Sequence, residues 1–362
     1  LKNKESITAK YLNSEKEIVY PQSRKKVNHK IILKGARENN LKNIDIEFPL
    51  NMMVAVTGVS GSGKSTLVKK ILYPAIQKNL DIYKEKSGEF KSIGGDLNLI
   101  DQVEYIDQNP IGRSSRSNPV TYLKVYDEIR QLFSKQSLAK SRNYKPKHFS
   151  FNVDGGRCDK CKGEGIIVIE MQFMADVSLK CDECNGKRFK KEILQIKFDN
   201  KSVNEILEMT LDESLSFFEK NNEYKIYNKL IPLKKVGLGY ITLGQSSSNI
   251  SGGEAQRIKL ASFISKGENK NKILFIFDEP TTGLHFHDIN YLIKSLFLLV
   301  ENGHSVIIVE HNLDMIKCAD YIIDLGPNAG ISGGKLVATG TPEEIIKTRQ
   351  SHTGRFLKEK LV

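Results

Sequence analysis

The sequence lacks any stretch that approaches the roughly 20 consecutive apolar residues needed to cross a bilayer. Its first residues also lack the basic and then apolar pattern of a secretion signal. We therefore expect a cytoplasmic protein with no membrane partner. The chain begins with Leu1 instead of Met, so we also expect it to be part of a longer protein.

Cysteine is scarce: there are five in 362 residues, and four of them form two Cys-x-x-Cys pairs. Without an export signal, this pattern indicates metal binding in a reducing compartment and argues against disulfides. The fifth, Cys318, is predicted to be a buried packing residue.

Acidic residues are outnumbered, with 43 Asp and Glu against 55 Lys and Arg, which gives a formal net charge of +12. An excess of this size favours an anionic partner such as nucleic acid, anionic lipid or nucleotide. Residues 130–148 concentrate basic side chains without one acidic residue. Charge alone does not decide between these partners.

A glycine-rich loop follows an apolar run at 53–57 that suits a buried parallel strand. The loop has the complete G-x-x-x-x-G-K-S spacing, in which glycines let backbone N–H groups point at phosphates. Lys64 is expected to reach the β- and γ-phosphates of ATP, and the Ser65 hydroxyl to ligate Mg²⁺. A helix is expected to start after it and to add its positive N-terminus. The predicted ATP-binding residues here are Gly58, Ser60, Gly61, Ser62, Gly63, Lys64, Ser65 and Thr66.

A second apolar run, at 273–277, ends in two adjacent carboxylates. Asp278 is predicted to hold Mg²⁺, and Glu279 to orient and deprotonate the attacking water. Two carboxylates at a strand end are an ordinary helix cap when they stand alone, but beside a phosphate loop they predict phosphoryl chemistry.

A third element, Ser251-Gly252-Gly253-Glu254, precedes a helical pattern and forms another anion-binding helix tip. Together with the phosphate loop it resembles the ATP-binding-cassette superfamily, where this tip is the signature motif. The resemblance implies that Gln108 is the Q-loop glutamine, that 282–285 is the D-loop, and that His311 is the switch histidine at the γ-phosphate. It also implies that the signature tip covers ATP bound by a second cassette, so this chain holds two half-sites.

The long stretch between Gln108 and the signature motif contains both cysteine pairs. Their spacing fits a zinc site with four thiolates and no open coordination position, which predicts structural Zn²⁺. Alternating residues at 167–174 predict a β-hairpin pinned by the metal. The predicted ligands are Cys158, Cys161, Cys181 and Cys184.

Several segments are similar to the UvrA family of the excinuclease ABC system, from about Ile32 to Val362. They include 107–122, the flanks of both cysteine pairs, the signature motif with its following residues, 278–286 and 310–314. The resemblance implies the C-terminal half of a damage-recognition ATPase of nucleotide excision repair. Such a protein binds damaged duplex DNA as a dimer and passes it to a helicase-like component of the excinuclease. We consider Arg113, Arg116, Lys187 and Arg188 as DNA-contacting candidates.

The expected fold class is α/β: a cassette core at 31–110 and 235–362, interrupted by an inserted signature domain at 111–234 with a zinc hairpin module at 155–191. The segment 6–12 resembles 351–357, since Ser, Thr and Leu recur at matched positions. The second copy closes a cassette, so we interpret residues 1–30 as the tail of a preceding cassette plus a linker.

Two alternatives stay open at this point. One is a paralogue of the same family that serves drug self-resistance and also binds DNA. The other is a transporter or translation-factor cassette, which the zinc-bearing insertion and the lack of an aromatic residue just upstream of Gly58 argue against.

Overall fold

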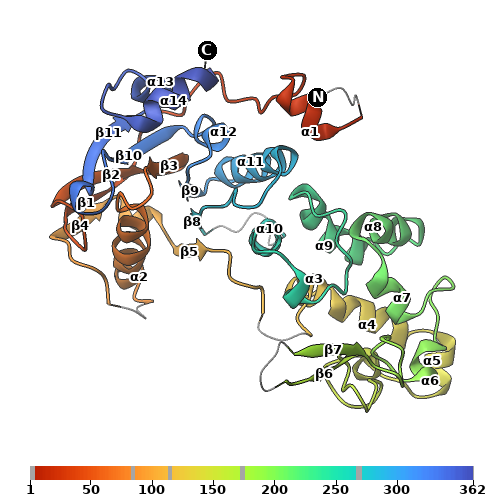
Figure 1. Cartoon of the computed structure of the whole chain (residues 1–362). Helices are drawn as coiled ribbons and strands as arrows, with labels where there is room; N and C mark the ends of the chain where they lie inside the picture. The colour runs from red at the N-terminus through yellow and green to blue at the C-terminus, as the bar shows by residue number, and fades with distance from the viewer. Residues whose placement is uncertain (1–4, 83–85, 113–115, 172–175, 266–270, 362) are drawn as a thin grey trace. The chain divides into compact units, whose positions relative to one another are not determined.

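The computed structural model describes residues 5–82, 86–112, 116–171, 176–265 and 271–361. These residues form two units: Leu1–Gln108 with Lys266–Val362, and Asn109–Ser265. Within the described ranges, no helix combines the length and apolar character needed to span a membrane. Figure 1 labels the elements.

The first unit contains a six-stranded sheet in the order β11-β10-β3-β9-β8-β5. All neighbouring pairs are parallel except β10 and β11, which are antiparallel. The central strands are apolar and buried along their whole length, as expected for a parallel sheet covered on both faces. The strands are β3 (Met53–Gly58), β5 (Gln102–Ile106), β8 (Ile273–Asp278), β9 (Ser305–Val309), β10 (Tyr321–Gly326) and β11 (Lys335–Gly340).

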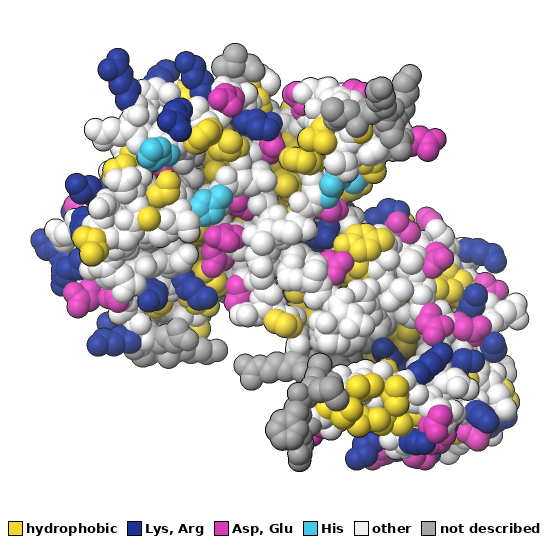
Figure 2. Space-filling model, in the orientation of Figure 1, with side chains coloured by type: hydrophobic (Ala, Val, Ile, Leu, Met, Phe, Trp, Pro, Cys, Tyr) yellow, Lys and Arg dark blue, Asp and Glu magenta, His cyan; other side chains and the backbone are white. Residues whose placement is uncertain are grey.

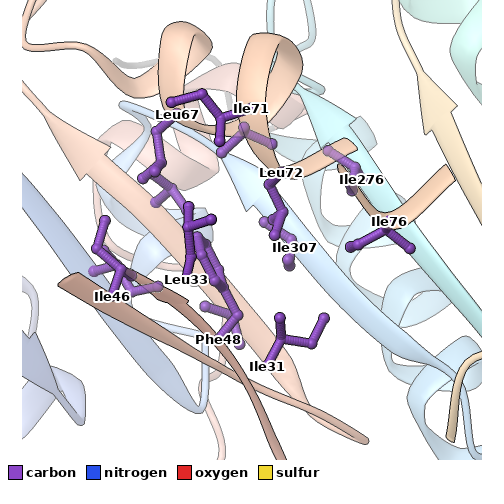
Figure 3. Close-up of a cluster of buried hydrophobic side chains, with 14 of the residues drawn as sticks. Ile31, Leu33, Ile46, Phe48, Leu67, Ile71, Leu72, Ile76, Ile276 and Ile307 are labelled. Carbon is purple, nitrogen blue, oxygen red and sulfur yellow. The ribbon is translucent and has the colours of Figure 1, made fainter. Parts of the chain in front are cut away.

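A second, antiparallel sheet of the same unit has the order β2-β1-β4. Its strands are β1 (Lys30–Ala36), β2 (Ile44–Pro49) and β4 (Ser92–Gly95). Side chains from β1 and β2 meet those of the helical segment that follows the phosphate loop, and those of the large sheet, in one buried cluster (Figure 3). Leu33, Phe48, Ile71 and Ile307 are all fully buried there. This cluster supports the phosphate loop from beneath.

Helices complete the first unit. The phosphate loop continues into η1, a π-helical segment, and then directly into α2. The helix α11 packs against β9 and β3, and α14 packs against β3, α12 and α13. The helical segments are α1 (Ile7–Leu12), η1 (Thr66–Leu72), α2 (Tyr73–Asn79), η2 (Leu97–Leu99), α11 (Phe286–Glu301), α12 (Leu313–Ile316), η5 (Gly330–Ser332), α13 (Pro342–Ile345) and α14 (His352–Leu361).

The second unit is mainly helical and carries one β-hairpin, formed by β6 (Ile166–Ile169) and β7 (Val177–Lys180). An aromatic cluster forms part of its interior: the Tyr126 ring lies 4.9 Å from that of Phe151, and Phe133 lies 5.6 Å from Phe149. Its helices are α3 (Pro119–Tyr122), α4 (Tyr126–Ser134), α5 (Ser137–Ser141), η3 (Pro146–Phe149), α6 (Lys191–Leu194), α7 (Val203–Glu208), α8 (Leu211–Lys220), α9 (Tyr224–Lys235), η4 (Ser247–Asn249) and α10 (Gly252–Ile264).

The inserted unit ends later than the 111–234 expected from the sequence, because it also contains α10. This helix packs against α9. In addition, the Arg257 guanidinium donates to the carbonyl oxygen of Gly237 (3.3 Å) and to the hydroxyl of Tyr240 (3.1 Å). The signature motif therefore belongs to the second unit and not to the cassette core, as the range 235–362 had placed it.

Candidate nucleotide and metal sites

The phosphate loop turns sharply where β3 ends, and its shape depends on glycine. Gly58 has φ +133°, and a Cβ atom there would lie 2.0 Å from the carbonyl oxygen of Leu325. Gly61 and Gly63 also have positive φ values, of +75° and +107°. Such a backbone exposes successive N–H groups on one side, which makes a concave site for anions.

Lys64 lies inside this loop. Its ammonium group donates to the carbonyl oxygens of Gly58 and Val59, both at 3.0 Å, and the residue is only 5% exposed. Burial lowers the pKa of Lys64, whereas the nearby carboxylates of Glu279 and Asp278 oppose that shift. The Lys64 ammonium group is thus buried in the loop, close to the carboxylates of Glu279 and Asp278.

A cavity of about 370 Å³ opens above the loop. It is lined by the loop itself and by residues from four further segments of the first unit, so residues far apart in the sequence converge on it. The lining residues outside 60–66 are Asn39, Asn40, Glu279, His311 and Gly330.

The two adjacent carboxylates diverge at the end of β8. The Tyr105 hydroxyl donates to Oδ2 of Asp278 at 2.6 Å, and burial together with this bond raises the pKa of Tyr105. Glu279 has left the strand and adopts φ +45°, which is unusual for a residue with a side chain. Its Oε1 lies 3.7 Å from Nε2 of His311, and its carbonyl oxygen accepts from the Gln108 amide at 3.2 Å. Gln108, Glu279 and His311 are therefore neighbours.

Glu310 holds this arrangement together, although no sequence pattern singled it out. Its carboxylate is 2% exposed and accepts four hydrogen bonds from the two turns beside it. Oε1 accepts from the backbone N–H and the hydroxyl of Thr281, at 2.9 and 2.6 Å. Oε2 accepts from the N–H groups of His311 and Asn312, at 2.7 and 2.9 Å. One buried carboxylate therefore fixes the turn after Glu279 relative to His311.

Glu310 was missed because two of its four hydrogen bonds come from Thr281, which lies 29 residues away in the sequence. The available signal was an acidic residue directly after a continuous apolar strand, a position at which a buried charge needs several donors.

Burial together with Lys64 lowers the pKa of His311, which favours the neutral imidazole at neutral pH.

The signature segment forms the N-terminus of α10 in the second unit. The Ser251 hydroxyl accepts from the N–H of Glu254 (3.3 Å), and the Glu254 carboxylate accepts from the N–H of Ser251 (2.8 Å). The Tyr240 hydroxyl also donates to this carboxylate, at 2.7 Å. Glu254 is therefore a helix-capping residue, and the N–H groups of Gly252 and Gly253 lie in the first turn, where the helix dipole is positive.

The four paired cysteines come together at the base of the β6–β7 hairpin. Their sulfur atoms all lie within 4.8 Å of one another, and all four residues are buried. The Sγ atoms of Cys158 and Cys181 are 3.9 Å apart, and those of Cys161 and Cys184 are 3.6 Å apart. A tetrahedral Zn²⁺ with Zn–S bonds of about 2.3 Å separates its sulfurs by roughly 3.8 Å, so the cluster has the size that zinc requires.

The fifth cysteine, Cys318, is fully buried and outside this cluster. Burial raises its pKa to about 12, so its thiol stays protonated.

The hairpin itself is almost entirely at the surface. Five of its large apolar side chains are each between 37% and 50% exposed: Ile166, Val168, Ile169, Val177 and Leu179. Figure 2 shows hydrophobic side chains gathered where β6 and β7 lie. Residues 172–174, part of the predicted hairpin, lie outside the described residues. Because so little apolar surface is buried here, the cysteine cluster is the main internal connection of this module.

The four basic residues considered for DNA contact have different environments. Arg113 lies outside the described residues. Arg116 is partly buried and pairs with Glu164 at 3.3 Å. Arg188 is half-buried, lies over the Phe151 ring at 5.7 Å from its centroid, and has its pKa lowered by burial. Lys187 is exposed, so it is the best placed of the described three for a phosphate.

The chain is similar to known proteins of one family. No protein-family model matches the chain. UvrABC system protein A from Clostridium perfringens is 54% identical over 362 residues, and the Staphylococcus aureus protein of that name is 52% identical over the same length. The chain spans only 38% of the length of each of these relatives. The crystal structure of UvrA2 from Deinococcus radiodurans is similar over the whole chain, with a TM-score of 0.92 and 41% identity, and the chain covers 43% of it. The predicted fold class is confirmed.

Replacement of Glu310 tests the positioning role described above. In Glu310→Gln, one oxygen acceptor becomes an amide donor that faces existing donors, so we expect a loss of about 1–3 kcal/mol in stability. Amide exchange at Thr281, His311 and Asn312 should accelerate. Hydrogen–deuterium exchange with mass spectrometry measures this effect. Glu301→Gln, an exposed position at the end of α11, is the matched control. Unchanged exchange in Glu310→Gln would contradict the role.

Proposed function

Since the chain belongs to the UvrA family of ATP-binding-cassette proteins, we propose that it is the C-terminal half of a DNA-damage-recognition ATPase of nucleotide excision repair. The observation that carries the ATPase part is the convergence of Lys64, Glu279 and His311 on one cavity of about 370 Å³. The family names of the curated relatives favour the repair function over a transporter or translation factor.

The proposed ATP site uses each side chain for one task. The N–H groups of the phosphate loop and the Lys64 ammonium bind the phosphates, and the Ser65 hydroxyl and the Asp278 carboxylate hold Mg²⁺. Mg²⁺ in that position neutralises charge that develops on the phosphate oxygens. Glu279 accepts a proton from the attacking water. The Gln108 amide contacts the carbonyl oxygen of Glu279, and the His311 ring lies beside its carboxylate. The cavity with its glycine-built cradle has the shape that this assignment requires.

A complete site on this proposal needs a second cassette. The signature tip at α10 offers a positive helix N-terminus with a serine and two glycines, and it is built into the second unit. It would close on ATP held by a partner cassette, from an N-terminal half or another copy of the chain. The chain by itself then binds ATP readily and hydrolyses it slowly.

The proposed nucleic-acid partner is damaged duplex DNA, with a helicase-like component of the excinuclease acting after it. The support is the family membership and the net charge of +12. Contacts to phosphate give affinity that depends on salt but carry no sequence information, which suits a protein that reads distorted DNA. The metal site is proposed to hold structural Zn²⁺, since its four thiolates leave no position open for chemistry.

Glu279→Gln removes the proposed base but keeps the size of the side chain. We expect ATP to bind with near-normal affinity, while the hydrolysis rate falls by at least about 100-fold. Steady-state ATPase assays at several protein concentrations measure this, and the wild-type rate per chain should rise with concentration. Glu219→Gln, on the exposed side of α8, serves as the control. Near-normal hydrolysis by Glu279→Gln would remove Glu279 as the base.

The metal assignment predicts close to one zinc per chain by elemental analysis. Cys158→Ala should reduce this to near zero and unfold the hairpin locally, because three thiolates bind the metal far more weakly. Cys318→Ala provides the matched control, since it removes a buried thiol outside the cluster and should retain the metal. Native protein that contains no metal would refute the site.

Lys187→Ala tests phosphate contact near the metal module. The substitution should weaken binding to duplex DNA and reduce the slope of log K against log salt by about one. Fluorescence anisotropy over a salt series measures the slope. Lys78→Ala, an exposed lysine in the first unit, removes the same charge elsewhere. Arg188→Ala is a poorer probe because it also removes packing on Phe151. Equal slopes for wild type and Lys187→Ala would move attention to residues 130–148.

A further inference from the structure

The last helix of the chain is attached to the strand that carries the phosphate loop. At its start, the Ser351 hydroxyl donates to Oδ2 of Asp324 (2.6 Å) and the Thr353 hydroxyl donates to Oδ1 (3.2 Å). Asp324 is 3% exposed on β10, the neighbour of β3. The Thr353 hydroxyl also contacts that of Thr57 at 3.1 Å, directly before Gly58. The Ser-x-Thr sequence thus fastens α14 to the base of the phosphate loop.

The same sequence occurs at the start of α1, as Ser6-Ile7-Thr8. The two helix starts have the same cap: the Ser6 hydroxyl accepts from the N–H of Ala9 at 3.2 Å, as that of Ser351 accepts from Gly354 at 2.7 Å. Their burial differs at the matched leucines, since Leu357 is 0% exposed and Leu12 is 61% exposed. At this leucine position, the face with which α14 packs into its cassette is therefore uncovered in α1.

A different face of α1 is occupied. The Tyr11 ring stacks on Phe286 with centroids 5.7 Å apart and an interplanar angle of 23°, and it meets His285 edge-on at 6.2 Å. The Thr8 hydroxyl lies 2.8 Å from Nε2 of His285, the last residue of the D-loop. The matched aromatic residue of α14, Phe356, is 47% exposed. The aromatic residue at the position of Tyr11 and Phe356 can thus contact a further cassette, because it does not belong to the face that packs into the helix's own cassette.

The segment between α1 and β1 is itself fixed to the first unit. The Arg24 guanidinium pairs with Glu343 at 2.7 Å and donates to the carbonyl oxygen of Ala319 at 3.2 Å. The backbone N–H of Lys25 donates to Asp320 at 3.1 Å. These bonds hold the end of the linker, just before β1, against the first unit.

We infer that α1 completes a preceding cassette in the way that α14 completes this one, so that one helix contacts the phosphate-loop strand of the first cassette and the D-loop of the second. The inference rests on the proposed function, in which a preceding cassette belongs to the same polypeptide. The partner surface must offer an apolar pocket for Leu12 and a buried carboxylate at the position equivalent to Asp324. A threonine hydroxyl donates one hydrogen bond and accepts another, so Thr8 serves both that carboxylate and His285.

The first test uses Leu12→Ala in the full-length protein with both cassettes and in the 362-residue chain. In the full-length protein we expect the unfolding midpoint of the preceding cassette to fall by roughly 5 °C or more, and in the shorter chain we expect no shift. Leu357→Ala is the control, since it should lower the midpoint in both. A full-length protein that is insensitive to Leu12→Ala overturns the inference. Calorimetry gives this answer without ATP or DNA, so it stays separate from any failure of the proposed function.

The second test addresses the D-loop contact. In Tyr11→Ala, amide exchange of residues 282–288 should accelerate several-fold, and in Phe356→Ala it should stay unchanged. Equal exchange in wild type and Tyr11→Ala overturns the contact.

Discussion

Parallel pairing of β3, β9 and β8 is the constraint on which the candidate nucleotide site depends. It brings the carboxyl ends of three strands to one edge, so the phosphate loop, Glu279 and His311 begin from adjacent points. The ladder extends beyond the strands, because Glu310 donates its N–H to Val56 and Glu279 donates to Val309. The Glu310 carboxylate then fixes the two turns that leave the sheet. The shape of the site is thus set by backbone hydrogen bonds first and by side chains second.

The two units are stabilised by different means. The cassette core buries a large apolar cluster between its two sheets and the helical segment after the phosphate loop. The hairpin module in the second unit has no comparable interior among its described residues, and a two-stranded hairpin is at best marginally stable in water. Gly163 (φ +86°) brings this module against the rest of the unit, since a Cβ there would lie 2.1 Å from the carbonyl oxygen of Phe151. A metal held by the four cysteines would therefore stabilise this module in the way that apolar burial stabilises the core.

Much of the fold and of the site was predictable because its signals are local. The phosphate loop, the apolar strands and the Cys-x-x-Cys pairs each depend on residues within a few positions of one another. Other features depend on partners far away in the sequence: the link from Glu310 to Thr281, the late end of the second unit and the half-burial of Arg188. Arg257 shows the difficulty: its charge suggests a surface position, yet it is 2% exposed and is bonded to the loop after α9. Single-sequence patterns carry no information about such pairings.

At Glu279, the left-handed backbone favours glycine for folding, whereas the proposed chemistry requires a carboxylate. A side chain with φ +45° costs of order 1 kcal/mol relative to glycine, so the sequence that folds most readily at this turn is not the one that carries a carboxylate. Replacement by glycine would relax the turn and raise thermal stability while it removes the carboxylate that lies 3.7 Å from Nε2 of His311. Selection for stability alone would drive this position away from glutamate, and its presence there marks a requirement that folding does not impose.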